Sequence, residues 1–325
     1  MAISIGRREF MAALGGAATA WPLPARAQQQ AMTRVGIVTI QPRTAPMYAA
    51  FDQRLRELGY VEGQNLALDY VNPEHRGIAG AIEELLRRKV DIILVTYEST
   101  LKAALAASVT VPIVMVAVDY DPLALGYVKS LARPGGNVTG LYLQQLDLAK
   151  KRVELLTQAL PSVRAVTVFW DTASEDQWKA TNSAATGFGL QAAGVELRDQ
   201  PYDYEKALAQ APPGNRGVVI FQVSPVFFRD RKQLADFALR HKIASVYGLR
   251  EWVDAGGLFS YGVNLPAMYR RAAELIDTIA KGAKVADLPV EQPTKFELIL
   301  NMKTADAIGV TISPAILVRA DEVIE

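Results

Sequence analysis

Short apolar runs and amphipathic stretches alternate along the first part of the chain. The run 35–40 is rich in β-branched residues, as a strand covered on both faces requires, and Phe51, Leu55 and Leu58 follow at helical spacing. The same pattern predicts strands at 65–70, 90–95 and 111–118 and helices at 78–86 and 99–108. Strands separated by helices indicate right-handed βαβ crossovers and one parallel sheet.

The alternation begins again after Arg164. It predicts strands at 165–170, 195–200, 217–223 and 243–247 and helices at 178–193, 204–211 and 229–242. The first and third strands begin 55 residues apart in the first half, at 35 and 90, and 52 residues apart in the second, at 165 and 217. This similar spacing favours two α/β lobes of the same winding over one large sheet.

The pattern changes after Gly256 and Gly257. A strand at 258–263, a helix at 266–281 and a strand at 296–301 predict that the chain crosses back between the lobes. We therefore expect an α/β protein with two doubly wound parallel-sheet lobes joined by a multi-strand hinge, about which rigid lobes can rotate. The expected limits are 32–140 plus about 263–290 for lobe 1 and 141–262 plus about 291–325 for lobe 2.

Composition narrows the possible functions. The chain has 325 residues, 50% of them hydrophobic, which is enough for two packed cores. Its 35 basic and 34 acidic side chains give a net charge of +1, so no strong basic field attracts nucleic acid. Without cysteine and with two histidines, thiolate zinc sites and iron–sulfur centres are excluded. We expect neither a cofactor nor a metal.

The first 27 residues have the pattern of an export signal. The segment 6–11, GRREFM, is similar to the twin-arginine pattern, and the apolar run 10–23 is too short to span a bilayer as a helix. Ala25-Arg26-Ala27 is a small-x-small cleavage site, which makes Gln28 the expected mature N-terminus. No cysteine follows to carry a lipid anchor. We expect a soluble protein of the periplasm.

Three further segments carry a resemblance to a known family. They are 130–140 (SLARPGGNVTG), 288–297 (LPVEQPTKFE) and 319–325 (RADEVIE). With the export segment, they resemble the substrate-binding proteins of ABC transporters, in particular the family that includes tryptophan- and tyrosine-uptake binding proteins. The resemblance covers essentially the whole chain. It implies a type I periplasmic binding protein fold, a small-molecule ligand, an ABC permease of the inner membrane as partner and no enzymatic activity. We expect a monomer.

The ligand is expected beyond the carboxyl ends of the strands, where open parallel sheets form their binding crevices. Aromatic, hydroxyl and carboxylate side chains gather at these ends and near the crossings, which suits an amino-acid-like or aromatic ligand. We expect Trp170 with Tyr97 or Tyr120 to stack on the ligand, and Ser99 or its backbone N–H to bind an anionic group. The candidate ligand-binding residues are Gln41, Thr96, Tyr97, Glu98, Ser99, Asp119, Tyr120, Asp121, Tyr142, Trp170, Asp171, Ser224, Tyr247 and Tyr261.

Several of these residues also have a structural interpretation. Ser99 is a good helix cap, and Asp121 before Pro122 fits an N-cap followed by proline at the first helical position. Glu98 favours a helix N-terminus. Its acidic side chain also departs from the small or neutral residues that the resemblance implies there, which would alter the charge of the ligand.

Alternative functions stay open at this point. A sensory receptor serving a chemoreceptor or kinase would have the same sequence features. An exported α/β enzyme would have Glu98, Asp119, Asp121 and Asp171 as its acid–base groups, although no nucleophile elbow, phosphate loop or metalloprotease motif occurs. A regulator of the lac-repressor type would need a helix-turn-helix where the export signal stands.

Overall fold

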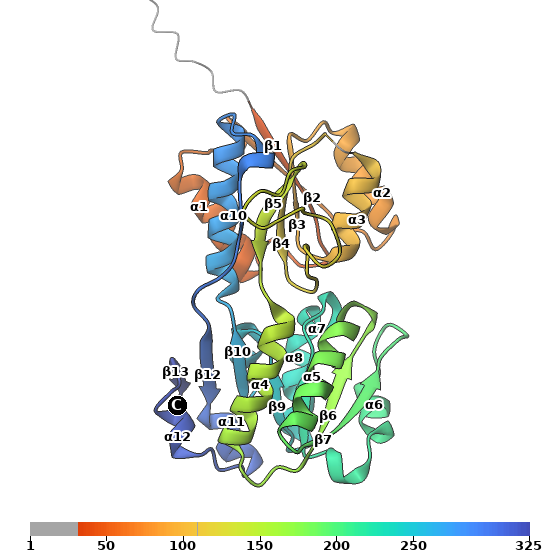
Figure 1. Cartoon of the computed structure of the whole chain (residues 1–325), viewed down its shortest axis with the longest axis vertical. Coiled ribbons are helices and arrows are strands. Elements are labelled where there is room, and N and C mark those ends of the chain that lie inside the picture. The colour runs from red at the N-terminus through yellow and green to blue at the C-terminus, as the bar shows by residue number, and fades with distance from the viewer. Residues whose placement is uncertain (1–31, 109) are drawn as a thin grey trace, which may run out of the picture. The chain divides into compact units, whose positions relative to one another are not determined.

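Residues 32–108 and 110–325 are described by the computed structural model, and they fold around two β-sheets (Figure 1). The expected export signal at 1–27 lies outside the described residues. In the part of the chain that is described, no helix combines the length and the apolar content needed to cross a bilayer.

The first sheet has the strand order β11-β5-β4-β3-β1-β2, with parallel pairs throughout the described residues. This is a doubly wound order whose topological switch point lies between β1 and β3. In Figure 1, α1 (Pro46–Glu57) and α10 (Leu265–Ala280) cover one face, and α2 (Gly77–Arg87) and α3 (Glu98–Ala107) cover the other. The strands are β1 (Thr33–Val38), β2 (Leu66–Val71), β3 (Ile92–Val95), β4 (Ile113–Ala117), β5 (Val138–Tyr142) and β11 (Val290–Glu291).

The second sheet repeats this winding with the order β13-β12-β10-β9-β8-β6-β7. Among its described pairs, β10 and β12 run antiparallel and the others parallel. Its strands are β6 (Ala165–Trp170), β7 (Gln191–Glu196), β8 (Val218–Phe221), β9 (Ala244–Tyr247), β10 (Phe259–Gly262), β12 (Glu297–Asn301) and β13 (Glu322–Ile324). Its helices are α4 (Gln145–Ala159), α5 (Glu175–Gly187), α6 (Tyr204–Gln210), α7 (Pro225–Arg229), α8 (Arg231–Arg240), α9 (Arg250–Asp254), α11 (Met302–Ile308) and α12 (Pro314–Leu317). The two sheets confirm the prediction of two doubly wound α/β lobes.

The described chain passes between the sheets from β5 to α4, from β10 to α10 and from β11 to β12. Tyr142 and Glu291 pair within the first sheet, close to the limits expected at 140 and about 290. We propose lobe limits at these three crossings. Arg152 of α4 connects two of them, because its Nε donates to the carbonyl oxygen of Tyr261 at 2.9 Å. Burial lowers the pKa of Arg152 to about 9.

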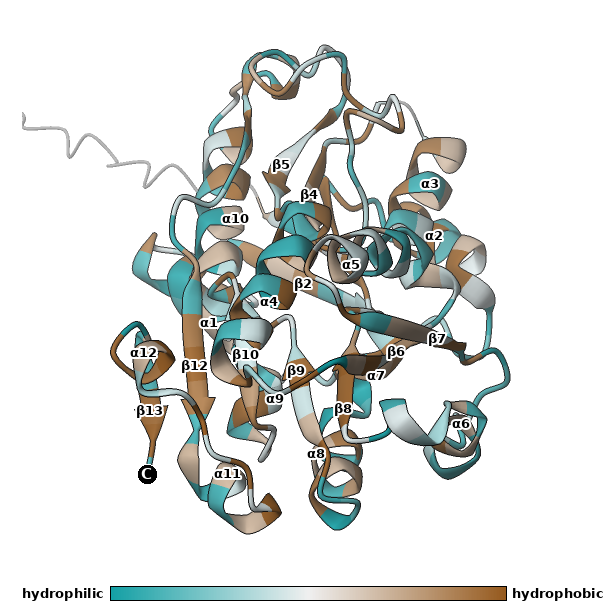
Figure 2. Cartoon of the chain, turned by 60° about the horizontal axis from the view of Figure 1, so that its bottom comes forward, coloured by the Kyte–Doolittle hydropathy of each residue, from teal (hydrophilic) through white to brown (hydrophobic). Residues whose placement is uncertain are grey.

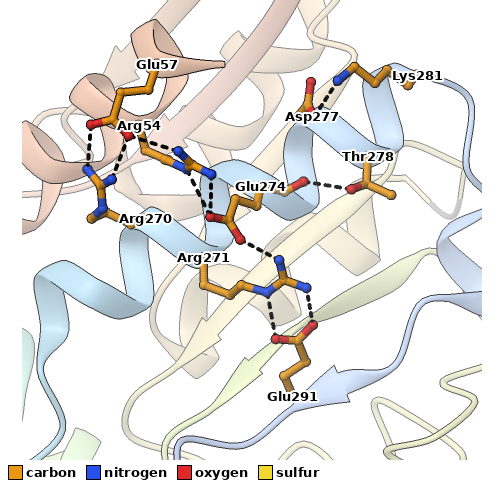
Figure 3. Close-up of polar contacts among 9 residues, drawn as sticks. All are labelled: Arg54, Glu57, Arg270, Arg271, Glu274, Asp277, Thr278, Lys281 and Glu291. Carbon is orange, nitrogen blue, oxygen red and sulfur yellow. Dashed lines mark hydrogen bonds and ion pairs between the residues drawn. The ribbon is translucent and has the colours of Figure 1, made fainter.

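Ion pairs link α1, α10 and β11 on the first lobe (Figure 3). Isolated exposed pairs contribute little stability, but a connected set fixes how the three elements are oriented. Because β11 leads into a crossing, the network also holds the start of that crossing against α10. The pairs join Arg54 to Glu274 at 2.9 Å, Arg270 to Glu57 at 2.6 Å, and Arg271 to Glu291 at 2.7 Å.

The predicted boundary between the helix that follows β6 and the next strand is wrong. The helix expected at 178–193 ends at Gly187, and β7 occupies 191–196 where the pattern predicted a strand at 195–200. Gly189 makes the turn with φ +72°. Gly194, which directly follows the expected helix, instead lies in β7 against the Trp178 ring, where a Cβ atom would come within 2.5 Å of a ring carbon. Close packing explains this glycine.

Each sheet has a buried apolar core that fixes where the strand ends lie. All residues of β3, β4 and β8 are buried, as expected for strands covered on both faces. The hydrophobic character of β6 and β8 is visible in Figure 2. In the second lobe the core includes a run of rings in which Tyr247 stacks on Phe221 and on Trp252, with centroid separations of 5.1 and 5.8 Å. These rigid cores position the loops that follow each strand.

Candidate functional site

Two cavities lie where loops at the carboxyl ends of strands from both sheets face each other. We call them the aromatic cavity and the acidic cleft. Residues just after β3 and β4 contribute to both, since Tyr97 and Val118 line the first and Glu98 and Asp119 line the second. The two cavities therefore share a wall made by these strand ends, close to the switch point of the first sheet.

The aromatic cavity is small and mostly apolar. Its volume of about 10 Å³ has room for roughly one water molecule. Both lobes contribute to its wall, because Val223, Phe228 and Leu249 come from the second lobe. Its lining residues are Gln41, Met47, Tyr48, Thr96, Tyr97, Val118, Val223, Phe228, Leu249, Leu265 and Tyr269.

Polar groups in the aromatic cavity are few and fixed. The side-chain hydroxyls of Thr96 and Tyr269 are hydrogen bonded at 2.5 Å. Gln41 is 6% exposed, and its Nε2 donates to the Pro225 carbonyl oxygen at 3.2 Å, a contact between the lobes. Its Oε1 is buried without a hydrogen-bond partner among the described residues. A buried acceptor without a partner costs free energy, so a donor brought by a ligand would be favourable here.

The acidic cleft is larger, at about 450 Å³, a size typical of small-molecule sites. Its walls also come from both lobes. The first lobe supplies Glu98, Ser99, Asp119, Tyr120, Asp121, Ala124 and Leu125, and the second supplies Leu146, Thr172, Ala173, Glu175 and Asp176.

Glu98 and Asp119 are coupled at the start of α3. The Glu98 backbone N–H donates to Asp119 Oδ1 at 3.1 Å, and the Tyr127 hydroxyl donates to the Glu98 carboxylate. The pKa of Asp119 is raised to about 7, chiefly by burial. The hydrogen bond from the Glu98 N–H opposes this rise, and the charges of Glu98 and Asp171 add to it. Burial and the Glu98 carboxylate raise the pKa of Tyr127 to about 12, so this hydroxyl remains a donor.

Asp121 caps a turn and not the helix that its sequence context predicted. Residues 122–126 form turns, and Asp121 Oδ1 accepts the backbone N–H groups of Leu123 at 2.9 Å and Ala124 at 3.0 Å. Pro122 fits such a turn as readily as a first helical turn, which explains the wrong prediction. Tyr142, 8% exposed at the end of β5, lies beside Asp121, and burial and this carboxylate raise its pKa.

In the second lobe, Asp171 and Ser224 support the cavity walls from behind. Asp171 is 3% exposed and accepts hydrogen bonds from Ser174 Oγ at 2.9 Å and from the Tyr202 hydroxyl at 3.2 Å. Burial raises its pKa, and hydrogen bonds from Ser224, Ser174 and Tyr202 oppose this shift. Ser224 is fully buried and caps α7, accepting the Phe227 N–H at 3.2 Å. These residues hold Thr172 and Val223 in the walls.

The remaining aromatic candidates line neither cavity. Tyr247 is 0% exposed and stacked in the second core, although its position at a strand end suggested the cleft. Tyr261 is half-buried on β10 with its ring centroid 6.1 Å from that of Phe296. Trp170 is half-buried at the end of β6, and its indole N–H has no hydrogen-bond partner among the described residues.

The structure brings eight of the fourteen candidates to the cavity walls and adds residues that the sequence did not single out. Tyr48 and Tyr269 come from α1 and α10, and Phe228 comes from α7. Glu175 and Asp176 follow Asp171 at the end of β6, so their position after a strand was an available signal. The helix-borne aromatic residues had no such signal, because they reach the cavity only through helix packing.

Comparison with known proteins identifies the family of the chain. A family model described as ABC transporter substrate binding protein matches residues 37–324. A tyrosine-binding protein of Clostridioides difficile (strain R20291) is 26% identical over 270 residues, covering 79% of this chain and 75% of that protein.

Solved structures of similar proteins share the fold. A conserved domain protein from Vibrio cholerae has a TM-score of 0.80 at 22% identity, covering 90% of this chain and 99% of its own. An ABC domain in complex with L-Trp from Streptococcus pneumoniae has a TM-score of 0.77 at 22% identity, covering 90% of this chain and 100% of its own. The fold is that of the type I periplasmic binding proteins. Since the family model matches nearly all described residues, the chain belongs to the family of ABC transporter substrate-binding proteins.

Proposed function

We propose that this protein is the receptor of an ABC importer, which captures an amino-acid-like or aromatic molecule between its lobes and delivers it to a membrane permease. The observation that carries the proposal is the pair of cavities whose walls come from the strand ends of both sheets. The acidic cleft, at about 450 Å³, has room for such a molecule, and the rings of Tyr120 in its lining and Tyr97 in the shared wall suit an aromatic group. The tyrosine-binding relative and the L-Trp-bound neighbour support the same ligand class.

Binding at such a site is coupled to the arrangement of the lobes. A ligand that contacts both walls stabilises the arrangement in which the walls approach each other, because its contacts are lost when they separate. The three crossings and the Arg152 bond to Tyr261 would confine the motion to a hinge. We propose that Gln41, Thr96, Tyr97, Glu98, Ser99, Asp119, Tyr120 and Asp121 contact the ligand.

A thermal-shift screen of the mature protein tests this function. A ligand at 100 times its dissociation constant should stabilise the native state by about 2.7 kcal/mol. With the best compound from a panel of aromatic amino acids, amines and acids, X-ray scattering should show compaction, and chromatography should recover the compound unchanged. Consumption of the compound would point to an enzyme, whereas binding without compaction would remove the hinge mechanism.

The proposed site of action rests on the expected export signal. We propose that the protein is exported to the periplasm and meets the permease as a monomer. Because Ala25-Arg26-Ala27 is the small-x-small site, the exported form should begin at Gln28. N-terminal sequencing of the periplasmic protein checks this prediction. A chain that keeps Met1 and fractionates with the cytoplasm would contradict it.

A further inference from the structure

The acidic cleft carries one sign of charge. Its lining includes five carboxyl side chains, and no lysine, arginine or histidine lines it among the described residues. Acidic groups come from both walls, with Glu98, Asp119 and Asp121 on the first lobe facing Glu175 and Asp176 on the second. Without a cation between them, these groups repel one another as the walls approach.

Neighbouring cations compensate this charge only in part. Outside the lining, Lys179 lies 3.0 Å from Glu175 and 3.1 Å from Asp176, and its side chain is 61% exposed. The carboxylates of the first lobe accept hydrogen bonds from neutral donors: Tyr127 donates to Glu98, and backbone N–H groups donate to Asp119 and Asp121. No lysine or arginine among the described residues forms an ion pair with these three carboxyl groups.

A second observation at the same cleft points to a ligand. Tyr120 lines it, is 7% exposed, and has a buried hydroxyl without a hydrogen-bond partner among the described residues. Burial also raises the pKa of Asp119 to about 7, so ionising this carboxyl costs the fold stability. An ammonium group would supply the missing partner of the Tyr120 hydroxyl, because it can donate a hydrogen bond to the hydroxyl oxygen. It would also offset the cost of ionising Asp119, because its positive charge neutralises the carboxylate.

The cavities offer little to an anionic group. The aromatic cavity is lined by no charged side chain among the described residues. At the start of α3, a position that favours anions, the first N–H is already bonded to Asp119 and the first residue is Glu98. A ligand carboxylate placed there would meet two carboxylates of the protein.

We propose that the acidic cleft binds a protonated amine of the ligand, and that this receptor prefers net-cationic amines to zwitterionic amino acids and rejects the matching acids. The inference rests on the proposed receptor function and names the charge class of its ligand. The cleft, at about 450 Å³, would hold the whole ligand, with the amine among Glu98, Asp119 and Tyr120 and any ring near Tyr97, which is adjacent to Glu98 in the shared wall.

The test compares compounds that share a carbon skeleton, which we call a frame, and that differ in charge. The panel is tyramine, L-tyrosine and 3-(4-hydroxyphenyl)propionate; tryptamine, L-tryptophan and indole-3-propionate; and, without a ring, isoamylamine, L-leucine and 4-methylpentanoate. Titration calorimetry at low salt should show the amine binding more tightly than the zwitterion and about tenfold or more tighter than the acid, because like charges at close range are strongly disfavoured. Any other order in the frame that binds overturns the inference while the receptor function stands.

The frames separate the two proposals. If only the ring-free frame binds, the aromatic part of the proposed function fails, and the charge preference is then decided by isoamylamine against 4-methylpentanoate. If no compound in any frame binds, the proposed ligand class fails and this inference fails with it. Higher salt should weaken amine binding, since exposed charges in the cleft are screened.

A variant pair ties the preference to the cleft. Glu98→Gln keeps an acceptor for the Tyr127 hydroxyl and removes one charge. It should weaken tyramine or isoamylamine binding roughly tenfold to a hundredfold, as expected for a lost charge-assisted hydrogen bond. Asp306→Asn, on the exposed surface of α11, is the matched control and should leave affinity unchanged. Equal amine affinity in Glu98→Gln and wild-type protein, with unliganded melting temperatures also equal, would overturn the assignment.

Discussion

Replacing Gly140 with alanine should destabilise the protein by roughly 3 to 5 kcal/mol, among the largest effects of any single substitution. Gly140 lies in β5, paired with Met115 of β4 and Val290 of β11, with φ +139°. A Cβ atom there would come within 1.9 Å of the Met115 carbonyl oxygen, which belongs to the backbone of a fully buried strand and cannot move aside. Clash and backbone strain therefore add.

Thermal unfolding measures this effect. For a chain of this size, each 1 kcal/mol lowers the melting temperature by about 2 to 4 °C, so a fall of roughly 6 to 20 °C is expected. Gly136→Ala is the matched control, because its Cβ atom would meet nothing within 4 Å and its φ is not positive. Similar melting temperatures for the two variants would mean that β4 and β5 can separate at the crossing into α4.

Topology explains which parts of the site could be predicted from the sequence. The sequence placed Gln41, Thr96 and Tyr97 at the carboxyl ends of strands, and all three line the aromatic cavity. In a doubly wound sheet, the binding crevice lies beyond these strand ends at the point where the strand order reverses, so the position of such residues follows from the topology. The strand β5 was not predicted, since its five residues include a glycine and its sequence, VTGLY, lacks clear alternation. Its register depends on its partners β4 and β11, which are distant in the sequence.

Side-chain direction was harder to predict than position. Tyr97 and Tyr247 both stand at the end of a strand, yet Tyr97 lines the aromatic cavity and Tyr247 is buried among the rings of its own lobe. Tyr269 reaches the cavity from α10, a helix that lies far along the chain but packs beside α1. Its contact with Thr96 depends on how the chain crosses back to the first lobe. Local pattern does not contain this information.

The contrast between Tyr97 and Tyr247 gives a second large effect. Tyr97→Ala should weaken binding of the best aromatic compound roughly 5- to 150-fold, the equivalent of about 1 to 3 kcal/mol for a lost aromatic contact. Tyr97 is half-buried, so the unliganded protein should lose less stability than when a fully buried ring is removed. Calorimetric titration of the variant measures the affinity, and a thermal melt without ligand measures the stability.

Tyr247→Ala should show the opposite pattern. Its ring is 0% exposed between Phe221 and Trp252, so truncation empties a large site and should cost about 3 to 5 kcal/mol of stability. Tyr247 lines neither cavity, so the folded fraction at low temperature should bind with nearly the wild-type affinity. If Tyr97→Ala instead lowers the melting temperature as much as Tyr247→Ala and leaves affinity unchanged, the aromatic cavity is part of the core. The ligand would then lie elsewhere along the strand ends.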